Sequence, residues 1–175
     1  MGKKFIFKIL TAGEGGVGKT TMLYRYLEGH FNSETKLTVG VEFFVKEIEI
    51  DEIECALQLW DFGGQDRFRF LLESYTLGAQ GAFLMFDLTR FFTTKTLDEW
   101  IKILRTHNPD LPILLVGTKN DLKDKISVDD DYCLKLKEEL NCFDFIKISS
   151  KTGENVNEIF KILVRKILTT KMVLI

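Results

Sequence analysis

An octapeptide near the start of the chain, G-x-x-x-x-G-K-T, strongly limits what this sequence can fold into. It runs from Gly13 to Thr20 and directly follows an apolar run, Phe5 to Leu10. A strand, a glycine-rich turn and a helix start, in this order, form a phosphate-binding P-loop. The glycines let successive backbone N–H groups face phosphate oxygens, and the helix start adds the positive end of its dipole. The motif therefore predicts an anion site at the end of a buried strand.

Two side chains of this motif carry specific chemistry. Lys19 can reach the β- and γ-phosphates of a nucleotide, and the Thr20 hydroxyl can ligate Mg²⁺. A glycine-rich turn that matches by chance is the alternative, and further motifs in order along the chain argue against it. The residues of this segment expected to contact a nucleotide are Gly13, Gly15, Gly16, Val17, Gly18, Lys19, Thr20 and Thr21.

The length and composition favour one globular domain over residues 1–175. Hydrophobic residues make up 45% of the chain and charged residues 29%, which argues against disorder. The net charge of −2 gives no strong basic field, so we expect no nucleic-acid partner. An odd set of cysteines without metal-ligand spacing predicts free thiols in a reducing, cytoplasmic compartment: Cys55, Cys133 and Cys142.

Nothing in the sequence points to a membrane anchor. No apolar stretch approaches the ~20 residues that a membrane span needs. Ile6 stands where a myristoylation signal has Ser or Thr, and the last residues, 171–175, contain no cysteine for prenylation. We expect a monomer without a lipid anchor.

Segments with strand and helix patterns alternate along the chain. This alternation predicts an α/β fold with a mostly parallel sheet and helices on both faces, in which ligands bind at the carboxyl ends of the strands. A first helix is expected from Lys19 to Glu28, and Phe31 to Val39 reads as a loop. The expected strands are Phe5–Leu10, Phe43–Ile50, Ile53–Trp60, Gly81–Leu88, Ile113–Val116 and Phe143–Ile148.

Later helices show start signals of different kinds. Thr96 to Glu99 reads as a capping box, and Ser127 before the acidic run 129–131 indicates a second start. Asn155 precedes the last helix. The apolar residues of that helix follow the spacing of one buried stripe: Val156, Ile159, Phe160, Leu163 and Ile167.

Asp61 to Gln65 forms a second glycine loop after a strand. The Asp61 carboxylate can hold Mg²⁺ through water, and the N–H of Gly64 can approach a γ-phosphate where a side chain would block it. Gln65 can then orient a water molecule. The string is weak by itself, but its place behind a P-loop makes it informative.

Two further strand ends carry polar residues that suit a guanine base. The carboxylate of Asp121, in Thr118-Lys119-Asn120-Asp121, can accept hydrogen bonds from N1–H and N2–H₂ of guanine, and adenine has no such donor pair. The stem of Lys119 can lie along the base plane. Ser149-Ser150-Lys151 follows the next strand, where backbone N–H groups can meet the guanine O6.

These motifs together resemble the Ras superfamily of small GTPases over nearly the whole chain. Thr38-Val39-Gly40-Val41-Glu42-Phe43 is similar to the T-I-G-V-D-F of the Rab branch. Two further segments, Leu57 to Asp61 and Gln65 to Arg69, are similar to the sequence around the second switch of that branch. Phe62-Gly63-Gly64 looks more like the x-G-G of the Arf branch, which leaves the Rab and Arf assignments both open.

The resemblance implies roles that spacing alone does not. Thr38 would ligate Mg²⁺ and sense the γ-phosphate, and Phe31 would pack edgewise against the base. The P-loop NTPase fold of the family implies six strands, the second antiparallel, and five helices. Thr118 stands where most members carry Asn, and Ser150 where they carry Ala. Gly63, which replaces an Ala of the Rab pattern, is expected to loosen its loop.

The implied function is a switch that binds GTP and GDP with Mg²⁺ and slowly hydrolyses GTP, with Gln65 and Lys19 as catalytic residues. Effectors, exchange factors and GTPase-activating proteins would contact Phe31–Val41 and Asp61–Tyr75. Arg67 and Arg69 read as a solvated switch face and not as an arginine finger, so an activator in trans is expected. A non-cycling, GTP-bound scaffold and an ATP-using P-loop enzyme are the alternatives; Gln65 argues against the first and Asp121 against the second.

Overall fold

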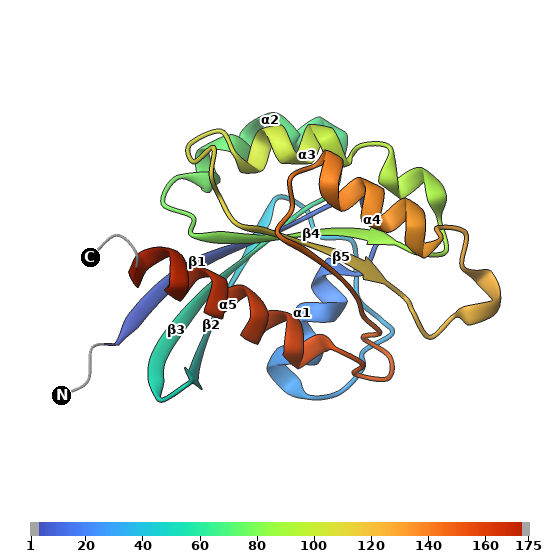
Figure 1. Cartoon of the computed structure of the whole chain (residues 1–175). Coiled ribbons are helices and arrows are strands. Elements are labelled where there is room, and N and C mark those ends of the chain that lie inside the picture. The colour runs from blue at the N-terminus through green and yellow to red at the C-terminus, as the bar shows by residue number, and fades with distance from the viewer. Residues whose placement is uncertain (1–3, 173–175) are drawn as a thin grey trace.

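Figure 1 shows the computed structural model of the protein, which describes residues 4–172. Short 3₁₀ helices lie at Asp66–Phe68, Glu73–Thr76, Phe91–Thr94 and Lys123–Lys125. The strands and α-helices, in chain order, are β1 (Phe5–Ala12), α1 (Lys19–Glu28), β2 (Val41–Ile50), β3 (Ile53–Phe62), α2 (Arg69–Leu72), β4 (Gly81–Asp87), α3 (Leu97–Leu104), β5 (Ile113–Thr118), α4 (Asp130–Glu139), β6 (Asp144–Lys147) and α5 (Val156–Met172).

The six strands form one sheet in the order β2-β3-β1-β4-β5-β6. Every neighbouring pair is parallel except β2 with β3, which form an antiparallel hairpin. The sheet lies between two layers of helices, α2, α3 and α4 on one face and α1 and α5 on the other (Figure 1). The expected α/β architecture, with a single antiparallel strand pair among the described residues, is confirmed.

The stripe expected along the last helix forms much of the core on its face of the sheet. All five of its apolar residues are buried, and Phe160 stacks on Tyr26 of α1 with ring centroids 3.6 Å apart. Phe160 also meets Phe83 of β4 edge to face, at 4.8 Å. This packing holds α1, whose first residues belong to the P-loop motif, against the sheet.

The turn between β2 and β3 explains why Asp51 and Glu52 serve as a hairpin pair. Both residues have positive φ, 51° and 64°, as a two-residue turn of the I′ type requires. The guanidinium of Arg165, on α5, donates to both carboxylate oxygens of Asp51 at 2.9 Å. A tertiary contact therefore stabilises a turn that the local sequence disfavours.

The caps of two expected helices differ from the sequence pattern. α3 begins at Leu97, directly after Thr96 as expected, but the capping box does not form. The Thr96 hydroxyl makes no cap to α3; it donates instead to the carboxylate of Glu14, while Glu99 pairs with Arg69. The fourth helix does not start at Ser127, because Asp129 caps it by accepting from the N–H of Tyr132 at 2.8 Å. At α3, the distant carboxylate of Glu14 binds the hydroxyl that the local pattern assigns to a cap. At α4, the carboxylate of Asp129 is better placed than the hydroxyl of Ser127 to cap the helix.

The described helices include none that is both long and apolar enough to cross a membrane. The extreme terminal residues, 1–3 and 173–175, on which the expectation about lipid anchors largely rests, lie outside the described residues. Cys55, Cys133 and Cys142 are free, as the sequence predicted, and all three are buried.

The corrected start of α4 can be tested by substitution. We expect Asp129→Ala to lower the free energy of unfolding by about 1 kcal/mol, because the N–H of Tyr132 loses its acceptor. Ser127→Ala is the matched control and should change stability by less than about 0.5 kcal/mol. Urea titrations of both variants measure the difference, and a larger loss for Ser127→Ala would restore the sequence-based helix start.

Candidate functional site

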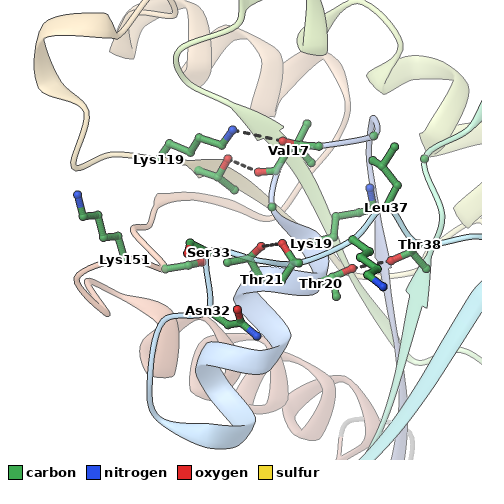
Figure 2. A pocket seen from close by; sticks show the side chains of 18 of the residues that line it. Val17, Lys19, Thr20, Thr21, Asn32, Ser33, Leu37, Thr38, Lys119 and Lys151 are labelled. Carbon is green, nitrogen blue, oxygen red and sulfur yellow. Dashed lines mark hydrogen bonds between the residues drawn. The ribbon is translucent and has the colours of Figure 1, made fainter.

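A pocket of about 470 Å³ opens at the carboxyl edge of the sheet (Figure 2). It is bounded by the P-loop and α1, by the loop before β2, and by the segments after β3, β5 and β6. Most of the residues proposed from the sequence line it: Gly15, Gly16, Val17, Gly18, Lys19, Thr20, Thr21, Phe31, Thr38, Gly64, Gln65, Thr118, Lys119, Asp121, Ser150 and Lys151.

Three proposed residues lie behind the pocket wall and touch residues that line it. The carbonyl of Gly13 accepts a hydrogen bond from Lys19 Nζ at 2.9 Å. Asp61 accepts from the Thr20 hydroxyl, and the Ser149 hydroxyl donates to Asp121. The structure thus brings the whole proposed set together, in part as lining and in part as support.

The P-loop end of the pocket, formed by residues 13–20, is suited to an anion. Within the described chain, no side chain caps the start of α1 and no acidic residue lies in its first turn. The first N–H groups of that helix therefore keep their hydrogen-bonding capacity, and its dipole is not neutralised. Backbone donors and a positive dipole end together favour phosphate.

Lys19 places a cation in the same end of the pocket. Its side chain is 5% exposed, and Nζ donates to the carbonyls of Gly13 and Glu14 at 2.9 and 2.8 Å. Burial lowers the pKa of Lys19 to about 8, although the carboxylates of Asp61 and Glu14 oppose the shift. The ammonium is held by neutral carbonyls that lack the charge to stabilise it fully, so an incoming anion would raise its pKa.

Two hydroxyls and a carboxylate converge beside Lys19. The Thr20 and Thr38 hydroxyl oxygens lie 2.6 Å apart, and Figure 2 shows these side chains pointing toward each other. Thr20 donates to Asp61 Oδ2 at 2.5 Å, and the buried Oδ1 of Asp61 has no hydrogen-bond partner among the described residues. Burial raises the pKa of Asp61, and the hydrogen bond from Thr20 opposes the rise.

This oxygen set fits a small hard cation. Mg²⁺ takes oxygen ligands and is usually held by one or two carboxylates together with phosphates and water. Over residues 4–172, no group of three His, Cys, Asp or Glu side chains could hold a metal by itself. A cation at Thr20, Thr38 and Asp61 would therefore need further oxygens from a ligand.

The opposite end of the pocket presents a carboxylate in a defined position. Ser149, which is fully buried, donates to Asp121 Oδ1 at 2.7 Å. Thr118 holds this end to the P-loop, because its hydroxyl lies 2.6 Å from the carbonyl of Val17 and 3.1 Å from that of Phe86. Oδ1 of Asp121 is thus committed in part to Ser149, and Oδ2 has no hydrogen-bond partner among the described residues.

Lys119 links the two ends. Its Nζ lies 2.8 Å from Asp87 Oδ2 and donates to the carbonyl of Gly16 at 3.3 Å. Asp87, at the end of β4, also pairs with Arg90 at 2.8 Å. Burial opposes ionisation of Asp87, but hydrogen bonds from Lys119, Thr89 and Arg90 hold its pKa below the usual range. The side chain of Lys119 is thereby fixed along the pocket wall.

The expectation that Gly63 loosens its loop is not supported by its packing. The N–H of Gly63 donates to the carbonyl of Gly40 at 2.8 Å, and a Cβ on Gly63 would lie 2.6 Å from the carbonyl oxygen of Thr38. A Cβ on Gly64 would lie 2.2 Å from the backbone nitrogen of Gly15. Both glycines permit backbone contacts that a side chain would prevent.

The description of Arg69 as solvated is wrong, whereas Arg67 is exposed as expected. The Arg69 side chain is only 11% exposed and pairs with Glu14, Asp66 and Glu99. Arg67 Nε donates to the side-chain oxygen of Gln65 at 3.1 Å. The two arginines of one short segment therefore have different environments.

Sequence reasoning missed two acidic residues near the site. Glu14 occupies a variable position of the P-loop motif, and no local pattern marks it. Asp87 ends a dense apolar run at the carboxyl edge of the sheet, and that position could have identified it. The pocket is also lined by residues that were not proposed: Asn32, Ser33, Thr35, Lys36, Leu37 and Leu122.

Comparison of the sequence with known proteins places the chain in one family. The model of the Ras family matches residues 8–169. The Ras-related protein YPT3 of Nicotiana plumbaginifolia is 37% identical over 157 residues, which cover 89% of this chain and 72% of that protein. The Ras-related protein Rab11E of Lotus japonicus is 38% identical with the same coverage, and the Ras-related protein SEC4 of Saccharomyces cerevisiae is 39% identical over 96% of this chain and 80% of its own length.

The low pKa of Lys19 predicts proton uptake when an anionic ligand binds. With its pKa lowered to about 8, Lys19 is partly neutral at pH 8, and bound phosphates favour the charged form. Calorimetry of GDP binding at pH 8, in buffers of different ionisation enthalpy, should report net proton uptake on binding. Affinity should fall as pH rises above 8; binding without proton uptake would contradict the electrostatic account of Lys19.

Proposed function

The chain belongs to the Ras family as a Rab-like small GTPase, a switch that binds GTP and GDP and hydrolyses GTP, and we propose that the pocket at the carboxyl edge of its sheet is its nucleotide site. The observation that carries this proposal is the pairing of two chemistries in one pocket. An uncapped helix start with a buried lysine lies at one end, and an oriented carboxylate, Asp121, lies at the other.

At the P-loop end, we assign the phosphates to Lys19 and to the backbone N–H groups of residues 13–20. These donors are in place before the reaction, so they neutralise developing charge without reorganising. The ammonium of Lys19 gains from an anionic ligand, because within residues 4–172 its hydrogen bonds go to the neutral carbonyls of Gly13 and Glu14. Binding and charge stabilisation thus use the same groups.

Ras-family GTPases generally use Mg²⁺ for nucleotide binding. Thr20, Thr38 and Asp61 are the residues that would hold it here, since their oxygens converge and Asp61 Oδ1 has no other partner among the described residues. When bound, Mg²⁺ would help to neutralise the negative charge of the phosphates. Because Thr38 lies in the loop before β2, the same contact would order that loop in the GTP state.

At the opposite end, Asp121 would accept from guanine N1–H and N2–H₂. Ser149 orients its carboxylate, Lys119 lies along the pocket wall, and the backbone N–H groups near Ser150 and Lys151 are assigned to O6. Phe31 lines the same pocket from the opposite loop, where it can cover the base. Adenine lacks the donor pair that this arrangement needs.

For hydrolysis, we assign the positioning of the attacking water to Gln65. Its side-chain amide can accept from and donate to one water molecule. Water then attacks the γ-phosphorus, the bond to the β-phosphate oxygen breaks, and Lys19 stabilises the charge that develops on that oxygen. Arg69 pairs with Glu14 and Glu99, and Arg67 contacts Gln65, so fast turnover is assigned to an activating protein in trans.

The loops 31–41 and 61–75 are proposed to carry the nucleotide state to partners. Members of the family act through regulators and effectors in general. In this chain the two loops expose large apolar side chains, which suits recognition by proteins. They are Phe31, Leu37, Val39, Phe70, Leu71 and Tyr75. We further propose a monomer formed by one domain, residues 1–175, that works in the cytoplasm.

Guanine recognition can be tested at Asp121. We expect Asp121→Asn to weaken GTP binding by about 100-fold or more, about 3 kcal/mol, because an amide donor would face a guanine donor. Xanthine nucleotides, which carry a carbonyl at C2, should regain affinity in this variant. Competition against labelled GDP measures both, with ATP as the negative control for wild type. Wild-type-like GTP affinity in Asp121→Asn would refute the assignment of the base.

Catalysis can be tested at Gln65. Gln65→Leu keeps the size of the side chain and removes both hydrogen-bonding capacities, so single-turnover hydrolysis of GTP should slow by about tenfold or more. Affinity for GTP should stay within about threefold, because the phosphates are assigned to other groups. Equal hydrolysis rates at equal affinity would remove Gln65 from the mechanism. Absence of hydrolysis in wild type would instead favour the GTP-bound scaffold.

A further inference from the structure

Glu14 is a P-loop residue whose side chain turns away from the phosphate site. Its carboxylate oxygen Oε1 accepts from Arg69 Nη2 at 2.5 Å and from the hydroxyl of Thr96 at 2.6 Å. Arg69 is the first residue of α2, and Thr96 directly precedes α3. One carboxylate thus joins the P-loop to the segment that follows Gln65 and to the start of a helix in the outer layer.

The pair that Glu14 forms with Arg69 is better shielded than the other contacts of that arginine. The side chain of Glu14 is 20% exposed, compared with 83% for Asp66 and 55% for Glu99. Arg69 also lies over the ring of Trp100, 4.9 Å from its centroid. Ion pairs weaken with solvent exposure, so the contact to Glu14 is the strongest tether of Arg69.

The tether lies close to the residues assigned to hydrolysis. Gly64 and Gln65 precede Arg69 by only a few positions, and the backbone of Gly64 packs directly on the P-loop beside Glu14. The loop is held at its beginning by the hydrogen bond from Gly63 to Gly40 and at its end by Arg69. Between these two attachments the chain is short, so the end attachment limits where Gln65 can lie.

We propose that Glu14 is a positioning residue for GTP hydrolysis: through Arg69 it holds the segment 64–69 against the P-loop, so that Gln65 stays within reach of the attacking water. Glu14 does not itself contact the phosphates in this account. The inference rests on the proposed function, because its effect is expressed in the hydrolytic step assigned to Gln65.

A positioning role and a purely structural role of Glu14 predict different effects of its removal on nucleotide affinity. A carboxylate near the phosphate site repels phosphate, so its removal should not weaken nucleotide binding. Loss of the tether should slow hydrolysis, because a small displacement of a positioned group strongly lowers the rate. A residue that only supports the fold would lower affinity, stability and hydrolysis together.

The test compares Glu14→Ala and Glu14→Gln with Glu99→Gln, a matched control that also contacts Arg69 but lies on α3. Single-turnover hydrolysis of GTP should slow by about tenfold in Glu14→Ala, and less in Glu14→Gln, which keeps an acceptor. GDP affinity should stay within about threefold. Amide hydrogen exchange of residues 64–72, in protein loaded with a non-hydrolysable GTP analogue, should become faster in Glu14→Ala.

The other possible results decide against the inference or against the proposed function. Unchanged hydrolysis in Glu14→Ala overturns the inference, as does a parallel loss of hydrolysis, GDP affinity and melting temperature. If Glu99→Gln slows hydrolysis as much as Glu14→Ala, the attachment to the P-loop is not the cause and the inference fails. If wild type itself does not hydrolyse GTP, the proposed function fails instead, and hydrogen exchange still reports whether Glu14 orders the segment.

Discussion

The site is built on the parallel pairing of β1 with β3 and β4. Thr11 of β1 lies opposite Asp61 of β3 and Phe83 of β4, and Asp87 of β4 lies opposite Thr118 of β5. Because these strands end at one edge of the sheet, the loops that follow them converge there. Four motifs that are far apart in the sequence therefore line or support one pocket.

The convergence of these loops also brings charged side chains together in a site that is largely shielded from solvent. Lys19, Asp61 and Asp87 are all buried. Lys19 is held by carbonyls of its own P-loop, whereas Asp61 and Asp87 have partners from other segments, Thr20 and Lys119. Burial disfavours the charged forms of Lys19 and Asp61: it lowers the pKa of Lys19 and raises the pKa of Asp61. An anion beside Lys19 and a cation beside Asp61 would each stabilise the charged form. The phosphates of a nucleotide would pair with Lys19, and its cation would pair with Asp61.

Much of this arrangement could be predicted because spacing encodes it directly. Gly29 marked the end of α1, and helix periodicity revealed the buried stripe of α5. The glycine spacing identified the P-loop. The contacts of Glu14 could not be predicted, because Arg69 lies 55 positions and Thr96 lies 82 positions further along the chain. Local patterns rank Thr96 as a cap, yet a distant carboxylate competes for its hydroxyl.

If this pocket holds a guanine nucleotide, the purified protein should retain one, and its nucleotide content can be measured. The protein would be purified with Mg²⁺ and no added nucleotide, denatured, and the released nucleotides separated by ion-exchange chromatography. We expect about one guanine nucleotide per chain, mostly GDP, since the protein hydrolyses GTP and the pocket encloses its ligand. Adenine nucleotides in that fraction, or no nucleotide retained even after incubation with GTP, would contradict the account.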